Sequence, residues 1–171
     1  ASLGADAVVA PGDAASLAAA VEGRASERVI IADAFARDAH DAVLETAEAL
    51  AQAGFTRIVL DDTRADANPL VVRQRLVDVN ARVRPVQVGV RLRDHAGLGS
   101  ANALSALKSG VTVFETTLGG VDGTLATEDV LYLLAMLEVG TVASRPAVVE
   151  AAARLAARWP IPLPSSTARI P

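Results

Sequence analysis

The chain has 171 residues, of which 51% are hydrophobic and only 3% aromatic, so its core is expected to consist mainly of Ala, Val and Leu. This length suits a single domain, and a net charge of -4 without long charge runs excludes nucleic acid and anionic membrane surfaces as main partners. The absence of cysteine excludes disulfides and favours a cytoplasmic location, and no apolar run reaches the roughly 18 residues of a membrane span.

Short apolar runs alternate with helical patterns along the first half of the chain. The runs are expected to be buried strands, at residues 5–10, 29–34 and 57–61. The segments between them have apolar residues at helical spacing and predict helices, at residues 13–22, at 41–53 and from Pro69 onward through Val72, Leu76 and Val79. Asp13 is a candidate N-cap, and His40 is expected to face solvent before the second helix.

The second half continues the same alternation. Strands are predicted at residues 86–90 and 111–114, with a glycine turn and a helix around Leu98 to Leu107 between them. A glycine loop at 119–123 precedes a helix at 127–138, for which Thr127 is the candidate N-cap. An additional helix spans 145–158. We therefore expect one α/β domain at residues 1–158, followed by an irregular, proline-rich tail at 159–171.

This alternation of strands and helices predicts about five right-handed β-α units with parallel strands. From the pattern alone, an open doubly wound sheet is the first choice of architecture. A closed (β/α)8 barrel needs eight strands and about 250 residues, which is more than this chain provides.

Two stretches of the sequence resemble the hydroxymethylglutaryl-CoA (HMG-CoA) lyase family. They are D-H-A-G-L-G-S-A-N-A-L-S-A-L-K-S-G-V-T-V-F-E-T-T-L-G-G-V at 94–121 and L-A-T-E-D-V-L-Y-L-L at 125–134; V-L-D-D-T at 59–63 is a weaker match in the correct order. That family belongs to the metal-dependent TIM-barrel lyases and aldolases. The resemblance implies a partial TIM barrel that corresponds to strands four to eight, with the additional C-terminal helix. Such a fragment is expected to leave two unpaired edges and an exposed apolar face. We therefore expect it to form a homo-oligomer or to bind a partner protein that completes the barrel, unless it flattens into an open α/β sheet or is a piece of a longer protein.

The resemblance also implies where a divalent metal would bind. In the family, the ligands are an Asp on the first strand, two His in an H-x-H-D motif on the seventh, and an Asn just before L-A-T-E-D. Here the motif reads Arg91-Leu92-Arg93-Asp94, and Thr124 stands at the Asn position. A guanidinium has no lone pair to give a metal, so no metal cofactor is expected. The residues that do match the family around the mouth of the barrel are Asp62, Asp94 and Glu128.

The arginine pair has two interpretations. Arg91 and Arg93 are two residues apart on a strand, so their side chains share one face. Either they form a salt-bridge network with Asp62, Asp94 and Glu128, or they bind an anionic ligand beside Asp94, which would be a carboxylate, a phosphate or an acyl-CoA group. His95 follows the strand at its carboxyl end and is either a general base, with Asp62 and Glu128 as further candidate catalytic residues, or a polar turn residue.

Three hypotheses for function follow. The first is a degenerate HMG-CoA lyase-like protein, a pseudoenzyme without metal-dependent carbon–carbon cleavage that acts as a binding or scaffolding subunit. The alternative is an active lyase or aldolase on an acyl-CoA or 2-oxo acid substrate, completed by a partner chain. The third is an α/β interaction module that shares only the fold.

Overall fold

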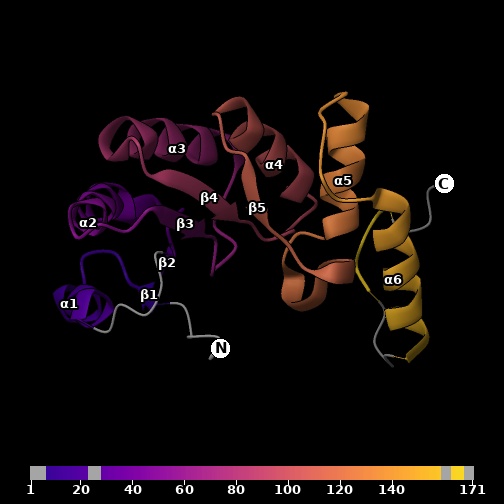
Figure 1. The fold of residues 1–171 in the computed structure, drawn as a ribbon, viewed down its shortest axis with the longest axis horizontal. Coiled ribbons are helices and arrows are strands. Elements are labelled where there is room, and N and C mark those ends of the chain that lie inside the picture. The colour runs from indigo at the N-terminus through magenta and orange to yellow at the C-terminus, as the bar shows by residue number, and fades with distance from the viewer. Residues whose placement is uncertain (1–6, 23–27, 159–162, 168–171) are drawn as a thin grey trace.

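The structure, a computed structural model, describes residues 7–22, 28–158 and 163–167. Its five strands form one parallel sheet in chain order: β1 (Ala7–Val9), β2 (Arg28–Ile31), β3 (Arg57–Asp61), β4 (Gln87–Arg91) and β5 (Val113–Glu115) (Figure 1). The helices are α1 (Ala14–Glu22), α2 (His40–Gln52), α3 (Pro69–Val83), α4 (Gly99–Lys108), α5 (Thr127–Met136) and α6 (Arg145–Arg158), with short 3-10 segments η1 (Arg37–Ala39) and η2 (Leu118–Gly123). This strand order never reverses, as it would in a doubly wound sheet. The predicted partial TIM barrel is therefore confirmed, and the open doubly wound alternative is wrong.

The outer face of the sheet carries the core. Alternate residues of the strands, such as Ile31, Leu60 and Val90, are buried there in one apolar cluster with helical residues that include Leu50 and Leu76. The helices that supply these residues, α2, α3 and α4, pack side by side in chain order. One face of each parallel β-α unit is thus closed in the usual way, by its own helix.

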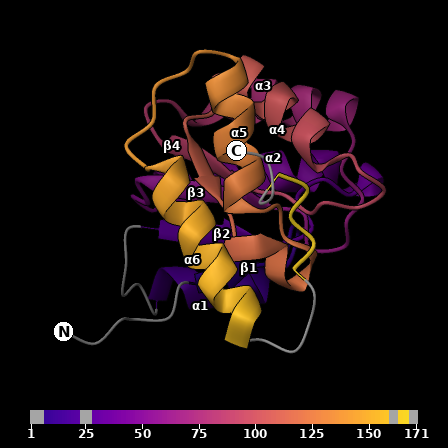
Figure 2. The same cartoon turned by 90° about the vertical axis from the view of Figure 1, so that its right-hand side faces the viewer.

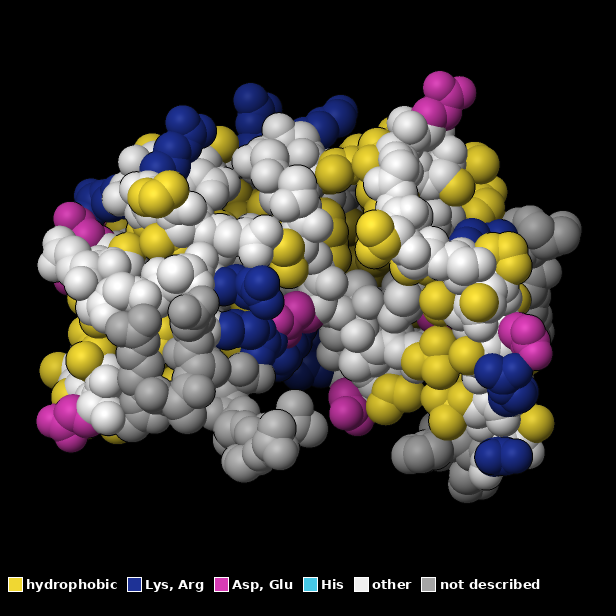
Figure 3. Space-filling model, in the orientation of Figure 1, with side chains coloured by type: hydrophobic (Ala, Val, Ile, Leu, Met, Phe, Trp, Pro, Cys, Tyr) yellow, Lys and Arg dark blue, Asp and Glu magenta, His cyan; other side chains and the backbone are white. Residues whose placement is uncertain are grey.

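The inner face of the sheet differs from the expected exposed apolar face. Ile30, Val59 and Gly89 lie level across the three central strands, and Ile30 and Val59 are buried. Around this apolar centre, the strand residues that point inward are charged or polar, and they include Arg28, Arg57, Gln87, Asp61, Arg91 and Glu115. In the space-filling view, blue side chains gather with a magenta one in the hollowed middle of this face (Figure 3). Val8 and Val113 extend the apolar row onto the two edge strands, and Val8 is 56% exposed. The expected exposed apolar face is thus limited to this central row, and charged or polar side chains lie on either side of it.

Side-chain capping explains the starts of two helices, α3 and α1. Asn68 Oδ1 accepts the amides of Leu70 and Val71 at 3.1 and 3.2 Å and begins α3, and Asp13 Oδ1 accepts the Ala15 amide at 3.0 Å before α1. Thr127 was predicted to be the N-cap of α5, and this prediction was wrong. The cap position falls on Ala126, and the Thr127 hydroxyl lies 2.8 Å from that of Thr116 instead.

Helices α5 and α6 form the end of the molecule beyond β5, opposite α1 (Figure 1), and α6 lies in front when this end faces the viewer (Figure 2). Within the described residues, β1 pairs only with β2 and β5 only with β4, so the sheet is open at both edges. None of the helices in the described ranges has the length and apolar character that crossing a membrane requires.

Candidate functional site

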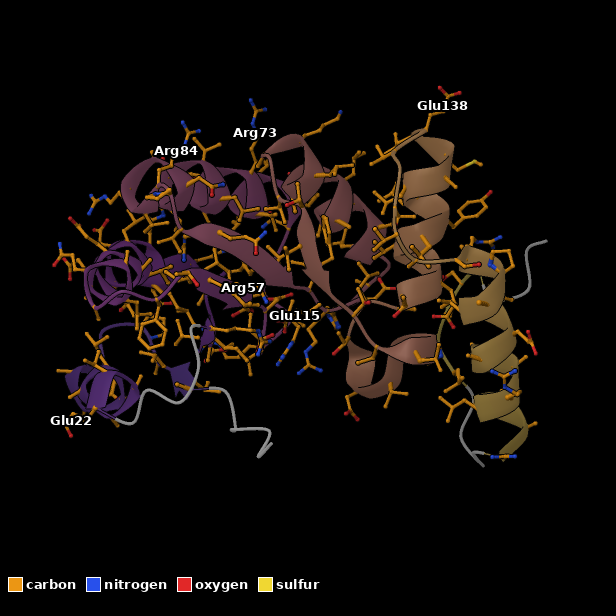
Figure 4. All side chains as sticks on the ribbon, viewed as in Figure 1. Glu22, Arg57, Arg73, Arg84, Glu115 and Glu138 are labelled. Atoms are coloured by element: carbon orange, nitrogen blue, oxygen red, sulfur yellow. The ribbon has the colours of Figure 1, made fainter. Side chains whose placement is uncertain are left out.

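A carboxylate on β5 holds two arginines across the inner face. Glu115 Oε2 accepts Arg91 Nε at 3.1 Å and Nη2 at 2.7 Å, while Glu115 Oε1 accepts Arg28 Nε at 2.8 Å and also Arg28 Nη2. Arg91 Nη1 lies 4.0 Å from Asp61 Oδ2. We call Arg28, Asp61, Arg91 and Glu115 the inner-face cluster; Figure 4 labels Glu115 and the nearby Arg57 over the strands. The cluster confirms that Arg91 belongs to a salt-bridge network.

The predicted partners of that network were wrong. Asp94 Oδ1 accepts the Gly99 amide at 2.9 Å, and Glu128, which is fully buried, accepts the Gly119 amide at 3.0 and 3.1 Å. Asp62 accepts the amides of Ala67 and Arg93 at 3.0 and 3.4 Å. These three carboxylates therefore fix the loops that follow the strands, and none of them pairs with an arginine side chain of the residues that the structure describes.

Glu115 and Arg28 were missed because the pairing of strands is needed to find them. Glu115 lies opposite Arg91 in the register of β4 and β5, while Arg28 lies opposite Arg57 at the start of β2 and β3. The alternation of side chains along a strand could have indicated this pair. Glu115 lies on the same face of its strand as Val113, and Arg91 lies on the same face of its strand as Gly89.

Asp62 is the residue of the site whose pKa departs most clearly from its ordinary value. Burial raises the pKa of Asp62 from 3.8 to about 6; the hydrogen bonds from the Ala67 and Arg93 amides oppose this, and the charge of Asp61 adds to it. A raised pKa means that the folded state binds this proton more tightly than the unfolded chain does. The resulting stabilisation is fully present below pH 3.8 and is lost as pH rises through about 6.

We expect Asp62→Asn to remove this pH dependence. From pH 4 to 7.5, the free energy of unfolding of the wild type should fall relative to that of the variant by about 2 to 3 kcal/mol. Urea unfolding at several pH values measures this difference. Asp38→Asn, at an exposed position, is the control and should follow the wild type. Parallel curves for the wild type and Asp62→Asn would show that Asp62 titrates normally.

Arg93 lines a hollow at the carboxyl ends of β4 and β5. The hollow measures about 520 Å3 and is lined by Arg91, Arg93, Phe114, Glu115, Thr116, Thr117, Asp122 and Thr124. Arg93 Nη1 donates to the carbonyl of Asp122, while its Nε is buried and has no hydrogen-bond partner among the described residues. We call this the Arg93 hollow. It brings Arg91 and Arg93 together, as predicted from their spacing.

The glycine turn beside this hollow is covered by the C-terminal segment. Gly119 has a φ of 72°, and a Cβ there would lie 2.5 Å from Leu163 Cδ1, so no larger residue fits without moving the tail. Ser165 donates its amide to the Gly119 carbonyl at 3.1 Å. Residues 163–167 contain neither helix nor strand, in keeping with the expected irregular tail, and the rest of 159–171 lies outside the described residues.

Asp129 fastens this segment to α5. Its carboxylate, which is 4% exposed, accepts four hydrogen bonds of 2.7 to 3.0 Å from the hydroxyl of Ser165, the amide of Ser166, and the amide and hydroxyl of Thr167. The tail, the glycine turn and the start of α5 are thereby packed as one unit next to the Arg93 hollow.

The residues at the family's metal positions do not fit a metal ion. Arg91 and Arg93 are cations without a lone pair, and Arg91 is held by Glu115. Within residues 7–22, 28–158 and 163–167, no group of three or more His, Asp or Glu side chains is placed to hold a metal. We therefore derive no chemistry through a metal at these positions.

His95 lies apart from the other candidate catalytic residues in its contacts. It is exposed in the loop after β4, and among the described residues only its backbone carbonyl takes part in a hydrogen bond, which the Leu98 amide donates at 3.0 Å. Asp62 and Glu128 are buried and bound to backbone amides. A catalytic role for these three residues stays a prediction.

Comparison with known proteins identifies relatives of the chain. A family model described as HMGL-like matches residues 1–153. The hydroxymethylglutaryl-CoA lyase YngG of Bacillus subtilis is 31% identical over 137 residues, which are 75% of this chain and 46% of that protein. The mitochondrial hydroxymethylglutaryl-CoA lyase of Bos taurus is 32% identical over 120 residues, or 65% of this chain and 37% of that protein. The chain thus spans less than half the length of these curated relatives.

Solved structures show the same fold. An HMG-CoA lyase from Bacillus subtilis superposes with a TM-score of 0.83 at 26% identity, over 91% of this chain and 59% of that one. An HMG-CoA lyase from Acinetobacter baumannii, solved in complex with coenzyme A and 3-methylmalate, superposes with a TM-score of 0.86 at 23% identity, over 95% and 64% of the two chains.

Proposed function

The chain belongs to the HMGL-like family, and we propose that it is a member without metal-dependent carbon–carbon lyase activity that acts as a binding or scaffolding subunit. The observation that carries this proposal is the inner-face cluster. In this cluster Glu115 binds Arg91. Arg91 stands at the first His position of the H-x-H-D motif, where the resemblance to the family implies a neutral imidazole as metal ligand. A cytoplasmic location belongs to the same proposal.

The lining of the Arg93 hollow is suited to a ligand that bears a carboxylate, either a free carboxylic acid or an acyl-CoA with a carboxylate group. Arg93 lines the hollow, and its guanidinium makes no ion pair with a carboxylate of the described chain, so an ionised carboxylate in the hollow would be a charge-assisted acceptor for it. Arg91 has a side chain that is 33% exposed in the same hollow and adds positive charge. The ligands of the Acinetobacter baumannii relative, coenzyme A and 3-methylmalate, provide suitable first probes.

We expect the purified chain to bind 3-methylmalate without added metal and not to cleave HMG-CoA with or without Mg²⁺ or Mn²⁺. Isothermal titration calorimetry measures the first, and release of free coenzyme A thiol measures the second. Arg93→Gln should weaken binding about 10-fold or more, because a charge-assisted hydrogen bond is lost. Arg154→Gln, in an exposed ion pair on α6, is the control. Metal-dependent cleavage would overturn the proposal.

The open sheet edges favour a second candidate, an active lyase or aldolase on an acyl-CoA or 2-oxo acid that a partner chain completes. The edges of β1 and β5 have no strand beside them in the described chain, and the match covers only 46% of the Bacillus subtilis lyase. Light scattering gives the mass of the assembly, and fractions can be assayed for cleavage. Cleavage confined to an oligomer would favour this candidate, whereas a monomer without activity would favour the first.

A further inference from the structure

A second hollow lies between the start of α2 and the start of α3 and shares no residue with the Arg93 hollow. It measures about 390 Å3 and is lined by Arg37, His40, Asn68, Leu70, Val71, Gln74 and Arg75. None of these lining residues is acidic, although two of them are arginines. The hollow therefore has a net positive lining in a chain whose overall charge is -4.

Arg75 is a buried cation whose direct contacts are all neutral. It is 2% exposed, and it donates to the carbonyl of Ala34, to the carbonyl of Ala36 at 3.2 Å and to His40 Nδ1 at 3.2 Å. Its positive charge is thus hydrogen-bonded, but no anion of the described part of the chain is in contact with it, a costly arrangement for a buried ion. Asp78 and Asp41 act on the charge only through space.

Arg37 supplies the second cation. Its side chain is exposed and takes part in no hydrogen bond or ion pair within the described part of the chain. His40 was expected to face solvent, but its side chain is only 32% exposed. Because His40 Nδ1 accepts from Arg75, its proton in the neutral form sits on Nε2, which lies 3.4 Å from Asp78 Oδ2. His40 is therefore already engaged, and the two guanidinium groups set the charge of the hollow.

We propose that this hollow binds the phosphoryl group of a small organic phosphate monoester. A phosphate monoester carries close to two negative charges at neutral pH, which match the two guanidiniums. The backbone amides at the start of α3 are taken by Asn68, so the side chains must recognise the anion. Leu70, 79% exposed, and Val71 line the same hollow and provide an apolar surface for the organic part of the ligand.

Titration of the 15N-labelled chain with phenyl phosphate, followed by NMR, tests this site directly. We expect saturable shifts of the amides at 37–40 and 70–75. Phenyl phosphate should bind more tightly than inorganic phosphate, which lacks the apolar part, and more tightly than benzoate, which carries a single charge. No saturable shift at about 10 mM phenyl phosphate, which corresponds to a negligible affinity, would overturn the proposal. So would shifts centred on residues 91–93, or benzoate binding as tightly as phenyl phosphate.

Two matched charge reversals on neighbouring elements distinguish a specific phosphate site from general attraction of the anion to a positive surface. Arg37→Glu changes an exposed residue of the hollow, and Arg73→Glu changes an exposed residue of α3 that is not in its lining and projects away from the molecule (Figure 4). We expect Arg37→Glu to weaken phenyl phosphate about 10-fold or more and Arg73→Glu less than about 2-fold at 0.1 M salt. Equal effects would show that only the surface potential attracts the anion. Arg93→Gln should leave this binding unchanged, which keeps the test independent of the proposed function.

Discussion

Glu115→Gln is expected to lower the free energy of unfolding by about 2 to 4 kcal/mol, because it leaves two partly buried cations without their shared anion. Glu115 is 19% exposed and accepts two hydrogen bonds from each of Arg28 and Arg91. The glutamine keeps the shape, but its amide group points donors at one of the two guanidiniums, so a favourable contact becomes a repulsive one. Urea unfolding at pH 7.5 measures the change.

Glu150→Gln is the control for this substitution. It removes the same charge from an ion pair with Arg154 that has a short 2.6 Å contact but lies on the surface of α6, with side chains 71% and 64% exposed. We expect an effect below about 0.5 kcal/mol, because solvent screens such pairs. A double-mutant cycle of Glu115→Gln with Arg91→Gln isolates the pairwise energy. If the two glutamate variants lost equal stability, the inner-face cluster would be no stronger than a surface pair.

The inner-face cluster bears on whether other strands must cover the inner face of the open barrel. A buried apolar inner face would require other strands to cover it, whereas here Arg28, Arg91 and Glu115 lie over the apolar centre formed by Ile30 and Val59. Charged groups of this kind remain solvated when the face is open. A charged inner face therefore needs less cover from another chain than an apolar one would, and in the described chain the unpaired backbone groups lie at the two sheet edges.

The order and approximate bounds of the strands and helices followed from the sequence because each element has a clear apolar period. Strand β3 lies at 57–61 as predicted, and α6 spans Arg145–Arg158 as predicted. The α5 cap was wrong because the Thr127 hydroxyl has a competing partner, Thr116, which comes close only when β5 and α5 are packed together. Capping preferences depend only on the residues of the helix itself, so they do not account for a hydrogen-bond partner from another segment.

The candidate site was predictable in its residues more than in its contacts. The spacing of Arg91 and Arg93 placed both in one hollow, and the ion-pair interpretation of Arg91 was correct. The predicted acidic partners of Arg91 were wrong because short acidic side chains that follow a strand accept hydrogen bonds from nearby backbone amides instead. Asp94, for example, accepts the amide of Gly99, five residues later in the chain. Glu115 remained available because it sits within a strand, where the backbone is already paired.

Arg75→Met is the other substitution for which we expect a large effect, a loss of about 2 to 4 kcal/mol in the free energy of unfolding. Two effects oppose each other here. Removing a buried cation relieves its desolvation, which also lowers the pKa of Arg75. Against this, the carbonyl oxygens of the buried residues Ala34 and Ala36 lose the guanidinium that donates to them, and Arg75 links α3 to the loop after β2 through these bonds. We expect the lost hydrogen bonds to dominate.

Two further variants decide between these effects. Arg73→Met makes the same change at an exposed position of α3 and should alter stability by less than about 0.5 kcal/mol. Arg75→Lys keeps the charge, but its single nitrogen cannot reproduce the planar fork with which Arg75 reaches three separate acceptors from three nitrogens. It should lose stability as well if these hydrogen bonds matter. Arg75 lies on the stripe of Val72 and Val79, three residues after one and four before the other, so its burial was readable from the helical period. A stable Arg75→Met variant would mean that the cation is retained at this position for binding rather than for folding, and phenyl phosphate should then stabilise the wild type but not the variant.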